Sequence, residues 1–126
     1  QMDIGPFILE AAGVDVPEYV EALSLLPAIE GSPWAGREFV FSEHARDGIL
    51  QETDFMSMVR SEDWKLVHFM GESFGQLFNL RFDPSEVENR WDDPDCQQVK
   101  QALLQTLLNW RMESQYQTSN WAAQWR

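Results

Sequence analysis

A carboxylate and an imidazole stand side by side in the chain at Glu43 and His44, at the end of a predicted strand. An imidazole titrates near neutral pH, so beside a carboxylate it could transfer a proton or orient a substrate. We favour a simpler interpretation, in which His44 faces solvent and Glu43 bonds to the backbone. Both residues stay candidates for substrate binding.

Two basic residues, Arg60 and Lys65, face each other across a predicted hairpin and could together bind an anion such as sulfate. The simpler account is that they form cross-strand ion pairs with Glu62 or Glu72. His68 lies inside the strand after the hairpin. We expect it to be a half-buried packing residue rather than a ligand.

The only cysteine, Cys96, follows the three aspartates Asp92, Asp93 and Asp95. A thiol near a helix start can have a lowered pKa, but we favour a structural role for Cys96. The aspartates lack the spacing of a calcium-binding loop, and helix capping explains them better.

The sequence also lacks a glycine-rich phosphate loop, a nucleophile elbow and a Cys/His zinc pattern. We therefore predict no catalytic residue and no metal or other cofactor.

The formal net charge of −12 argues against a nucleic-acid partner, because phosphate binding needs clustered lysine and arginine. A hydrophobic content of 44% in 126 residues is typical of one globular domain. No apolar run approaches the roughly 20 residues that a membrane span needs, and no signal-peptide pattern is present. We expect a soluble chain without a membrane partner, and the sequence assigns no compartment.

The first part of the chain, residues 1–31, is predicted to be helical. Residues 2–12 form a short helix with Asp3 as its cap and Gly13 at its end. One face of this helix carries apolar side chains at helical spacing, namely Ile4, Phe7, Ile8 and Ala11. A second apolar segment, residues 23–29, is interrupted by Pro27.

A sheet is predicted within residues 38–80. Its four short strands span residues 38–43, Phe55–Arg60, Trp64–Phe69 and 76–80, and residues 44–54 form a polar loop. Short strands in direct succession favour an antiparallel meander over parallel βαβ units.

A carboxyl-terminal helix is predicted over residues 93–117, since Asp93-Pro94 is typical of a helix start. Its apolar stripe can lie on the sheet and consists of Val99, Leu103, Leu107 and Trp110. Residues 118–126 are predicted as a polar tail that carries two tryptophans and could extend the helix. The predicted fold class is α+β, a small four-stranded antiparallel sheet packed by the carboxyl-terminal helix, with short N-terminal helices.

Six short motifs follow one another along the chain: Asp3-Ile4 with Pro6, Leu9 and Ala12-Gly13, Ser24-Leu25-Leu26-Pro27, Phe41-Ser42-Glu43-His44, Arg60 with Trp64-Lys65-Leu66, Leu77-Phe78-Asn79-Leu80, and Asp83-Pro84 with Glu86 and Asn89. Their order and spacing are those found at the carboxyl-terminal end of type I sulfatases, and the chain resembles that family of the alkaline-phosphatase-like superfamily. Two positions depart from the family pattern, Phe7 for its usual Thr and Ala22 for its Gly.

The resemblance implies a small subdomain that leans on a large domain, which holds calcium and a formylglycine nucleophile. In the family, the segment that matches residues 1–31 belongs to the large domain, and loops of the subdomain can line the substrate pocket. The Cys-x-Pro/Ser-x-Arg nucleophile motif and the calcium ligands lie upstream of the matching part. Cys96 does not fit that motif, because Gln98 and Lys100 occupy the positions of its Pro or Ser and its Arg.

We therefore expect a sulfatase fragment or truncated gene product that is not catalytically competent alone, an interpretation that a start at Gln1 also favours. The alternative is a free-standing interaction module that self-associates, as a two-fold dimer, through helix 2–12 and the tail. A third interpretation, an unrelated enzyme that uses Glu43 and His44, conflicts with the order of the six motifs.

Overall fold

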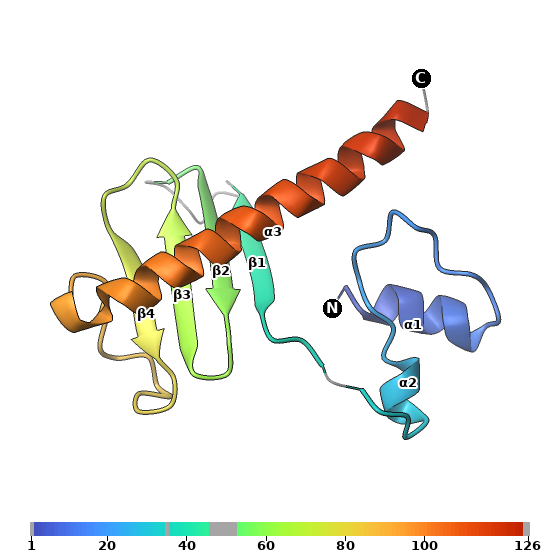
Figure 1. Cartoon of the computed structure of the whole chain (residues 1–126), viewed down its shortest axis with the longest axis horizontal. Helices are drawn as coiled ribbons and strands as arrows, with labels where there is room; N and C mark the ends of the chain where they lie inside the picture. Colours follow the sequence, from blue (N-terminus) through green and yellow to red (C-terminus); the bar gives the residue numbers. More distant parts are fainter. Residues whose placement is uncertain (1, 35, 46–52, 125–126) are drawn as a thin grey trace. The chain divides into compact units, whose positions relative to one another are not determined.

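The computed structural model describes residues 2–34, 36–45 and 53–124, with side chains up to residue 117 (Figure 1). The chain divides into two compact units. One unit is Arg37–Arg111 and contains a sheet, and the other combines Gln1–Gly36 with Met112–Arg126.

The sheet has four antiparallel strands in the order β1-β2-β3-β4, which confirms the predicted meander. The strands are β1 (Val40–Ala45), β2 (Phe55–Arg60), β3 (Trp64–Phe69) and β4 (Gly75–Asn79). The bounds of β2 and β3 are those predicted, and β4 begins and ends one residue earlier than predicted. The predicted bounds of β1 were wrong, because the strand runs on through His44 and Ala45 to pair with Met56 and Phe55. Most of the predicted 44–54 loop lies outside the described residues.

One face of the sheet, here called the helix face, carries the core of this unit. A 3₁₀ turn, η1 (Pro94–Cys96), leads into α3 (Gln97–Gln124), which crosses the sheet from β4 to β1 (Figure 1). Val59, Leu66 and Leu77 are direct neighbours across β2, β3 and β4 and are fully buried. Each such side chain contributes roughly 1.5–3 kcal/mol to stability.

The predicted apolar stripe of α3 packs on this core. Leu103 and Leu107 are buried, Val99 lies against the same cluster, and the ring of Trp110 stacks on Phe41 at a centroid distance of 4.5 Å. The helix backbone continues to Gln124, beyond the end predicted at residue 117. Residues 118–124 of the predicted tail therefore continue the helix.

The free edge of β4 is covered by the segment that connects it to α3. The amide of Asn89 accepts the Leu77 N–H at 2.9 Å and donates to the Gly75 carbonyl at 2.9 Å. The Arg90 N–H donates to the Leu77 carbonyl at 2.7 Å. Trp91 then lies over Gly75, where a Cβ atom would be only 2.4 Å from the indole ring. This segment satisfies edge groups that would otherwise be open to another strand.

The N-terminal unit contains α1 (Ile4–Ala11) and the short α2 (Leu26–Ile29). Asp3 does not cap α1 as predicted, because its Oδ1 accepts the Leu23 N–H at 3.0 Å instead. Gly13 ends the helix region at a φ of +72°, as predicted. Among the described residues of this unit only Pro6 and Ala22 are buried, so it has very little core.

Within residues 2–34, 36–45 and 53–124, no helix combines the length and hydrophobicity needed to cross a lipid bilayer.

Candidate functional site

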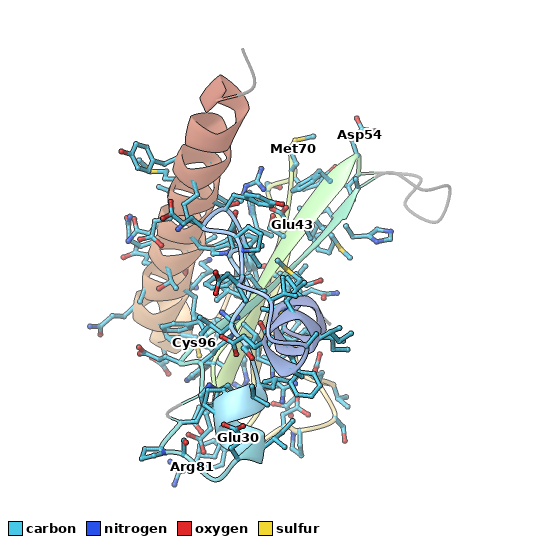
Figure 2. All side chains as sticks on the ribbon, turned by 90° about the vertical axis from the view of Figure 1, so that its right-hand side faces the viewer. Glu30, Glu43, Asp54, Met70, Arg81 and Cys96 are labelled. Atoms are coloured by element: carbon cyan, nitrogen blue, oxygen red, sulfur yellow. The ribbon has the colours of Figure 1, made fainter. Side chains whose placement is uncertain are left out.

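Glu43 lies on the helix face and ties the sheet to α3. Its Oε1 accepts the Ser57 hydroxyl at 3.2 Å and forms an ion pair with the Arg111 guanidinium at 2.5 Å. Arg111 also lies over the Phe55 ring, 5.5 Å from its centroid. Figure 2 shows Glu43 between the sheet and the helix. This carboxylate therefore has a structural partner on α3, a contact that joins residues far apart in the sequence.

His44 follows Glu43 in the same strand, so its side chain projects from the opposite face of the sheet. The His44 side chain is half-buried there and is already engaged in a contact within the protein. The structure thus does not bring the Glu43 carboxylate and the His44 imidazole together on one face. Substrate contact by either residue stays a prediction.

Arg60 and Lys65 are direct cross-strand partners, as the predicted hairpin requires, and lie on the face opposite α3. Arg60 is exposed, and the Lys65 ammonium forms an ion pair with Glu86 at 2.5 Å. The expected pairing of Lys65 with Glu62 or Glu72 was wrong, because the loop after β4 folds back over this face. Glu86 has a φ of +55°, in the left-handed region that non-glycine residues rarely adopt.

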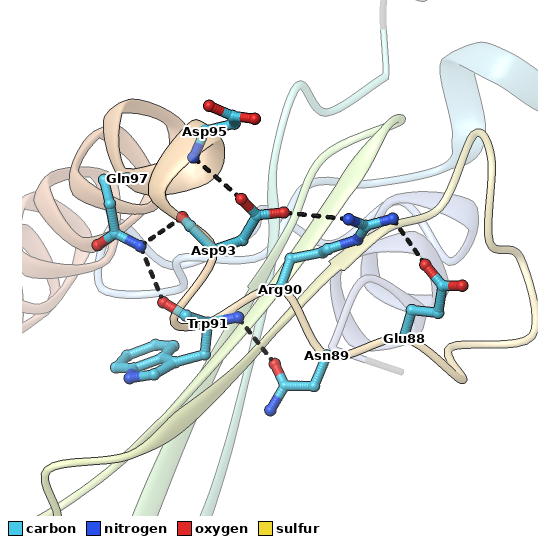
Figure 3. A network of polar contacts seen from close by, with 7 residues as sticks. All are labelled: Glu88, Asn89, Arg90, Trp91, Asp93, Asp95 and Gln97. Carbon is cyan, nitrogen blue, oxygen red and sulfur yellow. Dashed lines mark hydrogen bonds and ion pairs between the residues drawn. The ribbon is translucent and has the colours of Figure 1, made fainter.

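Of the three aspartates before α3, Asp93 is the one whose carboxylate caps the turn, within a network of polar contacts (Figure 3). Asp93 Oδ1 accepts the Asp95 N–H at 3.0 Å, as predicted for a cap, and its Oδ2 accepts from Arg90 at 3.0 Å. The other end of the guanidinium bonds Glu88 at 2.6 Å. The Asp95 N–H and then the Arg90 guanidinium hold the pKa of Asp93 below its usual value. In the part of the chain that the structure describes, no group of three or more His, Cys, Asp or Glu residues could hold a metal ion.

Cys96 has a neutral thiol at physiological pH. Burial, and then the neighbouring Asp93 carboxylate, raise the pKa of the Cys96 thiol above its usual range. The alternative of a lowered pKa was wrong, because burial and then the Asp93 carboxylate both disfavour the thiolate. A thiol of this kind is a poor nucleophile.

His68 is a half-buried packing residue, as predicted. Its ring lies roughly parallel to that of Trp91 at a centroid distance of 6.5 Å, on the helix face. Among the described residues its Nδ1 atom is buried without a hydrogen-bond partner.

A cavity of about 350 Å³ lies between the start of β3, the end of β4 and the segment that leads to α3. Its lining is Trp64, Asn79, Phe82, Asp83, Val87, Glu88, Arg90 and Cys96. The sequence analysis placed no cavity in the segment between β4 and α3, so this cavity was not predicted. The signal that could have found it is the pair Phe82 and Val87, two large apolar residues within a polar segment.

Comparison with known proteins gives the family. The family described as N-sulphoglucosamine sulphohydrolase, C-terminal, matches residues 1–113. An ulvan-active sulfatase of Formosa agariphila is 24% identical over 137 residues, covering 86% of this chain and 28% of the relative. The multifunctional alkaline phosphatase superfamily protein PehA of Trinickia caryophylli is 31% identical over 123 residues, covering 88% of this chain and 24% of the relative.

Solved structures have the same fold over most of the chain. A 2-O GAG sulfatase superposes with a TM-score of 0.80 at 23% identity, over 90% of this chain and 24% of that one. The phosphonate monoester hydrolase of Agrobacterium radiobacter superposes with a TM-score of 0.76 at 27% identity, over 89% of this chain and 24% of that one. The chain spans about a quarter of the length of these proteins. It belongs to the N-sulphoglucosamine sulphohydrolase C-terminal family, the carboxyl-terminal subdomain of sulfatases in the alkaline phosphatase superfamily.

Proposed function

We propose that this chain acts as the non-catalytic carboxyl-terminal subdomain of a sulfatase-type hydrolase and does not cleave sulfate esters by itself. The observation that carries the proposal is that the match covers only about a quarter of its relatives, such as 28% of the ulvan-active sulfatase. In that setting, residues 1–31 would pack on the larger catalytic domain and the sheet would support the substrate pocket.

The residues of this chain do not fit the calcium and formylglycine that the family implies. The Cys96 thiol has a raised pKa and lies outside the nucleophile motif. Asp93 is already engaged by Arg90 and by the Asp95 N–H. We therefore assign no chemical step to either group, and the candidates Glu43, His44, Arg60 and Lys65 would at most contact a substrate held elsewhere.

An assay of the purified chain with 4-nitrophenyl sulfate and calcium tests this proposal. We expect the wild type to release no more nitrophenol than a Cys96→Ala variant, because neither has an activated nucleophile. Calcium-dependent turnover that the Cys96→Ala variant lacks would show that the chain is a complete enzyme.

Self-association is a second candidate function, favoured by the exposed apolar face of α1. Ile4 and Ile8, one turn apart, are 50% and 57% exposed, and a second copy of the chain could cover them as a two-fold dimer. Light scattering across a range of concentrations would then give a dimer mass for the wild type and a monomer mass for Ile8→Asp. A monomeric wild type at all concentrations would remove this candidate.

A further inference from the structure

The cavity at the end of β4 has the size of a site for one side chain. Its volume of about 350 Å³ is at the low end of the roughly 300–1,000 Å³ typical of ligand sites. Trp64 and Asn79, which are direct partners across β3 and β4, line it from the sheet. Phe82 and Val87 line it from the connecting segment and are 82% and 78% exposed.

The charges around this cavity favour a cation. Its lining contains the carboxylates of Asp83 and Glu88 and one guanidinium, that of Arg90. Arg90 is shared between Glu88 and Asp93, so two carboxylates already offset its positive charge (Figure 3). Asp83 adds a further negative charge to the lining. Asp83 accepts the Glu88 N–H at 2.9 Å and forms no ion pair with a residue that the structure describes.

The aromatic groups favour a planar cation with an aliphatic stem. The Trp64 indole can accept a cation on its face, and the Phe82 ring already lies 5.9 Å from the Arg81 guanidinium. A guanidinium stacks on aromatic rings and matches a carboxylate with two N–H groups, whereas an ammonium is a compact and strongly hydrated charge. Phe82 and Val87 offer an apolar rim for residues on either side of such a side chain.

We propose that this cavity binds the side chain of an arginine, presented by a partner polypeptide with apolar residues beside the arginine. The guanidinium lies over Trp64 and bonds Asp83, and the flanking residues contact Phe82 and Val87. Binding of an arginine side chain in the cavity is independent of the proposed hydrolase role, because it needs no catalytic group.

The test is a titration of the ¹⁵N-labelled full chain with the blocked peptide Ac-Ala-Leu-Arg-Leu-Ala-NH₂, followed by NMR at the Trp64 indole N–H. We expect a saturable shift of that resonance. A peptide with citrulline, the neutral isostere of arginine, should bind about fivefold more weakly, because it lacks the charge for the ion pair and the cation–π contact.

Two test variants, each with a matched control, locate the site. Asp83→Asn keeps the acceptor for the Glu88 N–H but removes the charge, and it should weaken binding about fivefold. Asp54→Asn is the matched control, because Asp54 lies at the end of the sheet opposite the cavity, and this variant should bind as the wild type does. Figure 2 labels Asp54 far from Arg81, the residue that precedes Phe82 of the cavity. Phe82→Ser should also weaken binding, whereas Phe74→Ser, an exposed phenylalanine of the β3–β4 loop, should not.

Several results would overturn the proposal. They are the absence of a saturable shift at millimolar peptide, equal binding of the citrulline peptide, and an Asp83→Asn variant that binds as the wild type does. Shifts confined to residues outside the cavity would place the peptide elsewhere. Equal binding of free Nα-acetyl-arginine amide would show that the cavity takes a small guanidinium compound, not a polypeptide.

Discussion

At the scale of single residues, the Trp91 indole packs directly on Gly75 of β4. The indole ring takes the space of a side chain on β4, next to His68 on the neighbouring strand. The Lys100 ammonium lies over the same ring, 4.7 Å from its centroid, and donates to the Trp91 carbonyl at 2.7 Å. Trp91 thus joins the strand edge to the first turns of α3.

A Gly75→Ala substitution should therefore destabilise the protein by about 1–3 kcal/mol, because the added Cβ forces the buried indole to move. Urea unfolding measures this loss. The matched control is Gly5→Ala in α1, where no atom lies within 4 Å of the added Cβ and stability should not fall. Equal stability of Gly75→Ala and the wild type would mean that the indole can shift freely.

The charge on Asp93 predicts a dependence of stability on pH. Its pKa is lowered in the folded protein, so it stabilises the fold fully above its ordinary value of 3.8, and this contribution is lost as the pH falls through the lower folded-state pKa. Asp93→Asn keeps a capping side chain but removes the charge. The variant should be less stable than the wild type at pH 7, and the difference should shrink below about pH 4. Asp92→Asn, at an exposed neighbouring position, is the matched control and should be as stable as the wild type at pH 7.

At the scale of elements, sequence periodicity was a good guide to β2, β3 and the core stripe of α3. Alternation and helical spacing are local patterns, so they can be found in one sequence. The cover of β4 by Asn89, the Lys65–Glu86 pair and the cavity beside Phe82 could not be found in this way. Each depends on how the segment after β4 folds back on the sheet, which local propensity does not determine.

The cover of β4 can be removed with one substitution. Asn89→Ala loses the bonds to Leu77 N–H and Gly75 carbonyl, and also the acceptor for the Trp91 N–H at 3.1 Å. We expect a loss of about 1–3 kcal/mol, with faster hydrogen exchange at the Leu77 amide. Asn109→Ala, on the exposed surface of α3, is the control and should be nearly neutral. An unchanged Leu77 exchange rate would show that the edge is protected without Asn89.

At the scale of the whole molecule, the two units differ in how much of their apolar surface is buried. The sheet unit has a core of fully buried side chains, such as Leu66 and Leu77. In the N-terminal unit, Pro6 and Ala22 are the buried residues among those described. This difference supports the proposed function, in which residues 1–31 would pack on a larger catalytic domain.

Hydrogen exchange of the full chain should therefore separate the two units. Amides of α1 should exchange at least about 100-fold faster than those of β2 and β3, because few buried contacts oppose their local opening. Mass spectrometry of peptic fragments measures both regions in one sample. Equal protection of α1 and β3 would mean that the N-terminal unit is held by more than its own contacts, as in a dimer.

The position of Trp91 also has a spectroscopic consequence. Its indole is 8% exposed within the sheet unit, whereas that of Trp34 is 42% exposed in the N-terminal unit. A buried indole emits at shorter wavelength and is shielded from dissolved quenchers, and an indole in water is not. The chain has six tryptophans, so the emission that is lost on replacing Trp34 or Trp91 by phenylalanine, taken as the difference from the wild type, would report on one unit in each case.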